Sequence, residues 1–285
     1  MPPIPVLIDT DPGIDDSVAI LLALLSPNIS IKAITRVSGN LTADICTRNA
    51  LKVLDLSSNL GAREITVSQG PLAPICRPYP KDPFSHGADG LGELGLKDSD
   101  LKEDGRWAPD VILETVNSVW KETKDFKEDG DEGLTVLCLG PLTNLALAIK
   151  KDPTLPSRIR KVIAISGSFG FGTAGSVRAT GDNPASEWNV FVDPEAADMV
   201  FKSGLGSKVI ALGLDVTTRI DIDLSARHRE KLAEVIAASA KTSSEASFIL
   251  GVVGFGESKG FPSYCCLIDS LAVAVAIDES LVGAP

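Results

Sequence analysis

An open, mostly parallel β-sheet with helices on both faces is the fold that this sequence predicts. Short apolar runs rich in β-branched residues alternate along the chain with segments of helical period, the pattern typical of α/β proteins. Of the 285 residues, 44% are hydrophobic and 23% are charged, which is enough for a large buried core. No linker rich in Ser and Gly or in charge interrupts the alternation, so we expect residues 1–285 to form a single domain.

The first half of the alternation starts with residues 5–11 (PVLIDTD), which predict a buried strand. Residues 14–25 predict the helix behind it, with one apolar stripe at 3.6-residue spacing formed by Val18, Leu21, Leu22 and Leu25. The further strands expected in this half cover residues 29–38, 64–69 and 134–140, and the helices cover residues 43–56, 108–123 and 142–151.

The second half repeats the alternation with residues 161–167, 194–203, 208–216 and 225–241, and an apolar run covers residues 271–277. Two stretches are irregular: residues 71–105 are rich in Pro, Gly and Asp, and residues 167–186 are rich in Gly, Ser and Asn. Loops of this length in an α/β domain are more often functional than idle, so both are candidates for contacts with a ligand.

Composition excludes several classes of function. The formal net charge is −11 and no long run of Lys and Arg occurs, so binding to nucleic acid or to a membrane surface is not expected. The cysteines fit neither a disulfide framework nor a zinc site, because five is an odd number and no C-x-x-C pair occurs. The N-terminus lacks the pattern of a signal peptide, and no apolar run reaches the length of a membrane span. These features predict a cytoplasmic protein.

Four carboxylates occur where the first strand leads into the first helix, in residues 9–16 (DTDPGIDD). A strand period of two places Asp9 and Asp11 on one face, and the Pro-Gly turn brings Asp15 and Asp16 into the first helical turn. Capping and compensation of the helix dipole would explain Asp15 or Asp16 alone. They do not explain Asp11 together with both, because converging carboxylates repel each other unless a cation neutralises them. A hard cation such as Ca²⁺ or Mg²⁺ is the natural counter-charge.

Other strand ends also carry polar residues, and ligands in open α/β sheets bind beyond these ends. Residues 140–144 (GPLTN) follow a predicted strand and suit a tight turn with a helix cap. Asp269 precedes an apolar run and could be an ordinary cap as well. Strand alternation would send Glu187 and Asn189 to the same side, which suits sugar hydroxyls, although a half-buried edge strand would have the same pattern.

Six segments together resemble the inosine–uridine preferring nucleoside hydrolases, in the order of that family, from about residue 5 to about residue 277. The first of them is highly specific, and the others are jointly convincing. They are DTDPGIDDSVAILLALL at 9–25, Ser38-Gly39-Asn40, HGADGLG at 86–92, LGPLTNLALA at 139–148, SEWNVFVDPEAA at 186–197 and IDSLAVA at 268–274.

The resemblance implies a ribonucleoside N-glycosidase that binds Ca²⁺ and is expected to form a homo-oligomer. Asp11, Asp16 and Asp269 match the calcium carboxylates of the family, and the carbonyl of Leu139 matches its backbone ligand. Asp15 matches the general base, which takes a proton from the water that the ion activates. The positions implied to bind substrate are Asn40, His86, Asn183, Glu187 and Asn189, with an exposed loop histidine as the alternative for His86.

The sequence also departs from the family. Relatives commonly have His before the C-terminal metal Asp, where it helps to protonate the departing base, whereas this chain has Ile268. The Met-Gly-Gly of the family is replaced by residues 166–168 (SGS), and Asn183 matches only with a shift. The chain extends only eight residues beyond Ile277, so we expect a shortened C-terminus.

Two alternatives stay open from the residues. A catalytically weak relative would bind nucleoside or ribose without turning it over, and the departures above favour it. A Mg²⁺-dependent phosphotransferase of the haloacid dehalogenase type also begins with a strand that ends in Asp-x-Asp. In that class, however, Thr or Val typically follows the second Asp, and here a Pro-Gly turn and an Asp pair follow it.

Overall fold

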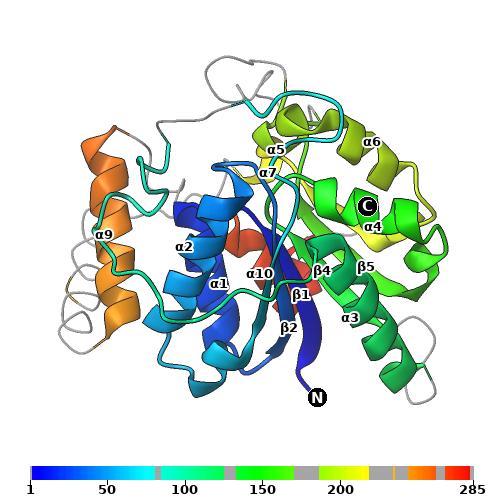
Figure 1. Cartoon of the computed structure of the whole chain (residues 1–285), viewed down its shortest axis with the longest axis horizontal. Helices are drawn as coiled ribbons and strands as arrows, with labels where there is room; N and C mark the ends of the chain where they lie inside the picture. Colours follow the sequence, from blue (N-terminus) through cyan, green and yellow to red (C-terminus); the bar gives the residue numbers. More distant parts are fainter. Residues whose placement is uncertain are drawn as a thin grey trace.

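The computed structural model describes residues 2–80, 85–124, 133–169, 186–217, 234, 243–260 and 267–282. Six parallel strands form its sheet in the order β3-β2-β1-β4-β5-β6 (Figure 1). The strands are β1 (Ile4–Thr10), β2 (Ile29–Arg36), β3 (Thr66–Gln69), β4 (Leu134–Cys138), β5 (Ile159–Ile165) and β6 (Val209–Leu212). The predicted fold class is confirmed.

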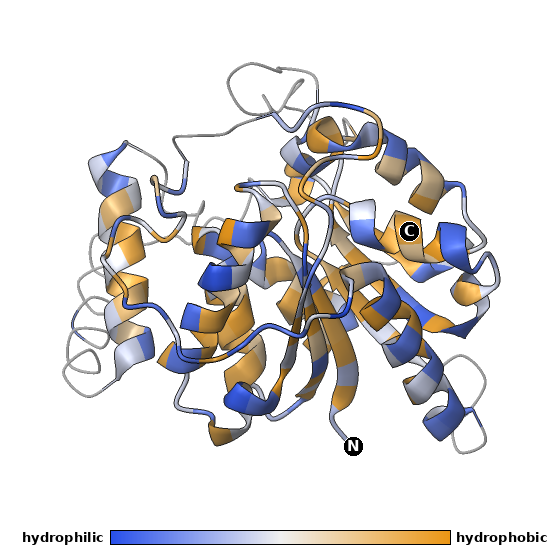
Figure 2. Ribbon diagram, viewed as in Figure 1, coloured by the Kyte–Doolittle hydropathy of each residue, from blue (hydrophilic) through white to orange (hydrophobic). Residues whose placement is uncertain are grey.

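Helices cover both faces of this sheet, and the two faces have separate apolar cores (Figures 1 and 2). The core on one face contains residues of α1 (Ile14–Leu25), α2 (Ala43–Leu56), α9 (Ser244–Ser258) and α10 (Ser270–Ile277), with α9 on the outer side of α1 (Figure 1). The other face packs against α3 (Ala108–Thr123), α4 (Thr143–Lys151) and α6 (Pro194–Phe201). Strand residues of β1 alternate between the two cores, Val6 and Ile8 on one side and Leu7 on the other, because successive side chains point to opposite faces.

The predicted boundaries agree closely with the structure in the first half of the chain. Helices α1, α2 and α3 have the predicted ends, and the strands differ by a few residues. The expected stripe on α1 is wrong in part, since Leu22 and Leu25 are 40% and 52% exposed. The sheet, α2 and α10 surround the rest of α1, so Ile20 and Leu24 are buried as well as Val18 and Leu21.

Two elements in the second half differ from prediction. The expected segment 208–216 is divided into β6 and the short helix α7 (Leu214–Thr217). The sequence does not predict helix α9, because the segment contains three glycines and its apolar residues are not gathered on one helical face. Residues 225–241, apart from residue 234, lie outside the described residues.

Short 3₁₀ helices complete the connections at Leu60–Glu64, Leu155–Arg158, Gly206–Lys208 and Glu279–Leu281. Residues 71–105 are irregular where they are described, apart from a parallel bridge between Asp104 and Ser68 at the edge strand β3. None of the helices that the structure describes combines the length and the apolar character needed to cross a membrane.

Candidate active site

The turn from β1 to α1 lies at the carboxyl end of one of the two central strands, and hydrogen bonds to Asp16 hold its backbone in place. The carboxylate of Asp16 accepts hydrogen bonds from the backbone N–H of Gly13 at 3.0 Å and of Asp11 at 3.2 Å, and from the Thr10 hydroxyl. Asp16 therefore caps the helix, as its position suggested. A side chain at position 13 would clash with the ring of His86, which explains the glycine.

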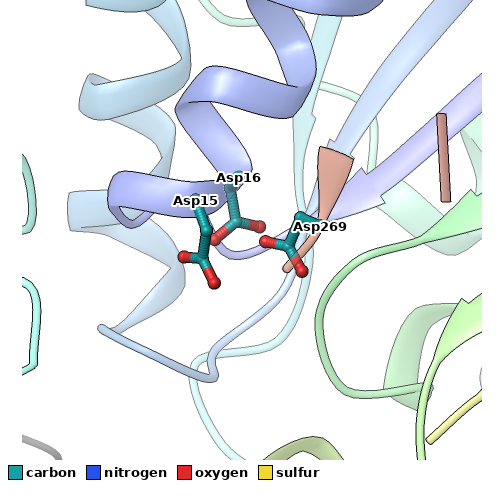
Figure 3. A group of neighbouring side chains, drawn as sticks. All are labelled: Asp15, Asp16 and Asp269. Carbon is teal, nitrogen blue, oxygen red and sulfur yellow. The ribbon is translucent and has the colours of Figure 1, made fainter. Parts of the chain in front are cut away.

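Three carboxylates from distant parts of the sequence meet beside this turn. Asp15, Asp16 and Asp269 each offer an oxygen atom, and these atoms lie within 4.8 Å of one another (Figure 3). Asp269 occupies the N-cap position of α10, but its side chain makes no capping hydrogen bond. Capping therefore does not account for Asp269, and its buried carboxylate faces the other two.

Asp11 lies at the edge of this group and is fully buried. Its Oδ2 accepts a hydrogen bond from the backbone N–H of Asn40 at 2.5 Å. Side chains at Gly39 or Gly140 would clash with the carboxylate of Asp11, so both glycines allow the backbone to approach it closely. The strand period does not extend to Asp11, because β1 ends at Thr10.

The electrostatics of the four carboxylates call for a cation. Burial raises the pKa of Asp11 and Asp269 well above the ordinary carboxyl value, and the neighbouring carboxylates raise it further. Burial raises the pKa of Asp15 to about 6, although His86 opposes this shift. Within the described part of the chain, no group donates a hydrogen bond to Asp11 Oδ1 or Asp15 Oδ1. Unsatisfied buried oxygens and excess negative charge fit a hard divalent cation.

Asn40 belongs to the turn that follows β2 and contacts two of the acidic residues. Its side-chain Nδ2 donates to Asp16 Oδ2 at 3.0 Å, in addition to the backbone contact with Asp11. Tyr79 donates its hydroxyl to the carbonyl of Gly39 at 2.9 Å and so braces the same turn. Asn40 therefore links the acidic group to the loop above β2.

His86 lies beside Asp15, in a loop that is 71 residues further along the chain. The backbone N–H of Ile14 donates to His86 Nδ1 at 3.1 Å. His86 Nδ1 is 3.7 Å from Asp15 Oδ1, and the ring is mostly buried. The alternative of an exposed loop histidine is wrong.

Glu187 and Asn189 lie near one another, but not on a strand. Glu187 caps the helix α5 (Trp188–Val192), accepting from the backbone N–H of Asn189 at 2.8 Å and of Val190 at 3.0 Å. Asn189 Nδ2 donates to the carbonyl of Leu139 at 2.7 Å, so Asn189 and Leu139, both predicted as site residues, are in direct contact. The expectation of strand alternation here is wrong, because Glu187 starts a helical turn. Asn183 lies outside the described residues.

Two further polar contacts at the strand ends were not predicted. Asp9 Oδ1 accepts hydrogen bonds from Asn144 Nδ2 at 2.8 Å and from the hydroxyl of Thr35 at 2.7 Å. Asp9 thus belongs to a separate buried network beside α4, and burial raises its pKa to about 7. The helix cap predicted for Thr143 or Asn144 in residues 140–144 is wrong, since α4 has Leu142 at the N-cap position. Contacts of this kind have no fixed spacing in the sequence.

The chain matches the model of the inosine-uridine preferring nucleoside hydrolases over residues 6–284. It belongs to this family. The sequence resemblance is therefore confirmed, and the membership decides against the phosphotransferase alternative.

Several nucleoside hydrolases are similar to this chain in sequence. It is 37% identical to uridine nucleosidase 1 of Arabidopsis thaliana over 217 residues, which are 76% of this chain and 58% of the relative. It is also 37% identical to the pyrimidine-specific ribonucleoside hydrolase RihA of Citrobacter koseri over 219 residues, 77% of this chain and 62% of the relative. The chain thus spans less than two thirds of the length of these curated relatives.

Solved structures of nucleoside hydrolases have the same fold over nearly the whole chain. A plant nucleoside hydrolase aligns with a TM-score of 0.75 and 31% identity, over 98% of this chain and 80% of the other. The purine-preferring ribonucleoside hydrolase from Gardnerella vaginalis aligns with a TM-score of 0.76 and 31% identity, over 98% and 81%.

Proposed function

We propose that this nucleoside hydrolase family member cleaves the N-glycosidic bond of ribonucleosides with water, giving free base and ribose. The observation that carries the proposal is the meeting of Asp11, Asp15, Asp16 and Asp269 beyond the carboxyl ends of the strands. In N-glycosidic cleavage, positive charge develops on the ribose, and a group of carboxylates stabilises that charge. The four similar proteins described above are all named nucleosidases or nucleoside hydrolases.

We assign Asp11, Asp16, Asp269 and the carbonyl of Leu139 as ligands of a Ca²⁺ ion. Support comes from the oxygen-only set of donors, the raised pKa values of Asp11 and Asp269, and the unsatisfied Asp11 Oδ1. When bound, such an ion would lower the pKa of a water molecule and orient it. The carbonyl of Leu139 already accepts from Asn189, and its second lone pair is the one proposed for the ion.

Asp15 is assigned as the general base that accepts the proton of the attacking water. A base works best when its pKa is close to the working pH, and burial brings the pKa of Asp15 up to about 6. Asp15 Oδ1 receives no hydrogen bond from the described residues, so a lone pair is available for the proton. Contacts with the ribonucleoside are assigned, from the match to the family motifs, to Asn40, His86, Asn183, Glu187 and Asn189.

Uridine is the first substrate to test, because the curated relatives described above are named for uridine or pyrimidine nucleosides. Within the same proposal the protein is a single-domain, homo-oligomeric enzyme of the cytoplasm that serves nucleoside salvage. The free thiols of Cys46, Cys76 and Cys138 support a reducing compartment.

A reducing-sugar assay on a panel of purine and pyrimidine ribonucleosides tests the proposal. We expect ribose to be released from at least one of them, and a chelator to stop the release until Ca²⁺ is returned. Binding of nucleosides with no release of sugar would instead identify a catalytically weak relative. Release that is indifferent to chelation would refute the metal assignment.

A further inference from the structure

Asn49, on α2, is buried between two backbone segments that are far apart in the sequence. Its side-chain Nδ2 donates to the carbonyl of Pro12 at 3.0 Å and to the carbonyl of Asp89 at 2.9 Å. Both partners can only accept, so the orientation of the amide group is fixed. One side chain therefore connects the turn before α1 with the loop that carries His86.

That loop, residues 86–93, is folded tightly on itself. The backbone N–H of Gly92 donates to the carbonyl of His86 at 2.9 Å, and Asp89 Oδ1 accepts from the backbone N–H of Leu91 and Glu93. Positive φ angles at Gly87, Gly90, Gly92 and Glu93 give it a compact path. A contact that fixes Asp89 therefore fixes the whole loop, including His86.

The approach of the loop to α2 depends on this asparagine. A Cβ atom at Gly90 would lie 2.7 Å from Asn49 Nδ2, which shows how closely the loop backbone approaches the side chain of Asn49. On its other side the loop is covered by α9, since Phe255 packs against Gly87 and Gly92. The hydrogen bonds of Asn49 thus fix the distance between residues 86–93 and the β1–α1 turn, and Phe255 of α9 covers the loop.

We propose that Asn49 is a positioning residue, which holds residues 86–93 against the β1–α1 turn so that His86 stays beside Asp15. The result of this docking is the hydrogen bond from the Ile14 N–H to His86 Nδ1 and the 3.7 Å approach to Asp15. Its importance for turnover rests on the proposed function, whereas the docking itself does not.

Hydrogen exchange of the Ile14 amide tests the docking without any assay of activity. This amide lies in the first turn of α1, where no acceptor within the helix is available, so His86 protects it. In Asn49→Ala we expect protection of Ile14 to fall by roughly tenfold, and to fall as far in His86→Ala. The Ser17 amide, bonded to the carbonyl of Gly13 within α1, serves as the internal reference and should keep its protection.

Asn59→Ala is the matched control, because Asn59 Nδ2 also donates to a backbone carbonyl, that of Leu24, at the far end of α1. It should leave the exchange of Ile14 unchanged. If Asn49→Ala does not fold, Asn49→Ser replaces it, since a serine hydroxyl can bond to its own helix backbone. Unchanged protection of Ile14 in a folded Asn49 variant would overturn the proposal.

A double-mutant cycle then tests the link to turnover. Asn49→Ala should lower kcat by about 10- to 100-fold, because small displacements of groups in a site have effects of this size. In a His86→Ala background, the same change should cost less than about twofold, since the two residues act through one contact. Additive losses would overturn the link to His86. If the unmodified protein cleaves no ribonucleoside, the proposed function fails, and the exchange experiment alone decides on Asn49.

Discussion

Replacing Asp269 with asparagine is expected to stabilise the cation-free protein and to remove its stabilisation by Ca²⁺. Asp269 contributes its carboxylate to the cluster with Asp15 and Asp16, and it caps no helix. The substitution therefore removes a negative charge without removing a helix cap. Because burial and the neighbouring carboxylates raise the pKa of Asp269, its ionised form destabilises the folded chain relative to the unfolded one.

The size of both effects follows from the length of the chain. At about 2.1 cal/mol/K per residue, the unfolding entropy of 285 residues is about 0.6 kcal/mol/K. A cation present at about 100 times its Kd stabilises the fold by about 2.7 kcal/mol, which raises the Tm by about 4–5 °C. Without the cation, each unit by which folding raises the pKa of Asp269 corresponds to about 1.4 kcal/mol, so Asp269→Asn should gain about 2 °C per unit.

Thermal unfolding at about pH 8, well above ordinary carboxyl pKa values, with a chelator and with Ca²⁺, measures both quantities. Asp278→Asn is the matched control, because Asp278 follows the other end of α10 and accepts from the backbone N–H of Ser280. The Asp278→Asn variant should have a slightly lower Tm than the unmodified protein, and Ca²⁺ should raise its Tm by the full amount. The reasoning is refuted if Asp269→Asn melts below the unmodified protein in chelator, or if it retains the Ca²⁺ shift.

Four other predictions follow from the site. Asp15→Asn should lower turnover by about 10²–10⁴ without lowering the Tm, and turnover equal to the unmodified protein would exclude Asp15 as the base. In chelator, the Tm should rise as the pH falls from about 8 to 5. The pKa values of Asp9, Asp15 and Glu187 in the folded chain are raised to about 7, 6 and 7, so these groups bind protons in the folded chain at a higher pH than in the unfolded chain. A Tm that falls over this range would contradict the prediction. Glu187→Gln should destabilise the fold by about 1–3 kcal/mol in denaturant unfolding, since an amide N–H₂ would face backbone donors; an unchanged midpoint would contradict the capping role. Ile268 cannot donate a proton to a departing base, so kcat/KM should be higher for p-nitrophenyl riboside than for inosine. Ile268→His should reduce this difference in kcat/KM. Equal kcat/KM values for the two substrates in the unmodified protein would show that another group protonates the leaving base.

The fold was predictable where hydrophobic period and turn residues agree. The apolar run of β1, the Pro-Gly turn and the helical spacing of the apolar residues after it all indicate the same boundary, and the structure has it at Ile14. Helix α5 was not predictable in this way, because its five residues, WNVFV, have the β-branched composition of a strand. Its helical form depends on Glu187, which accepts from two backbone N–H groups of the first turn. Capping outweighs propensity in so short a segment.

The acidic cluster was predictable for a different reason. Asp11 follows a strand end, Asp15 lies in the first turn of a helix and Asp269 precedes a helix. Such positions converge at the carboxyl edge of a parallel sheet. The contacts of Asn49 had no such signal, because its partners are the backbone carbonyls of Pro12 and Asp89. Any residue can supply a carbonyl, so neither the partner nor the spacing can be read from side-chain types.

Within the cluster, the hydrogen bonds divide the carboxylates into two kinds. Asp16 accepts from four donors, which are Thr10, the backbone N–H groups of Asp11 and Gly13, and Asn40, so its lone pairs are already in use. Asp11 and Asp15 each keep an oxygen that no described residue satisfies. A cation would therefore find free oxygens on the carboxylates next to Asp16. To bind Asp16 itself, it would have to share or displace one of the hydrogen bonds that Asp16 accepts. Within this one group, different carboxylates can thus bind the cation and accept the proton.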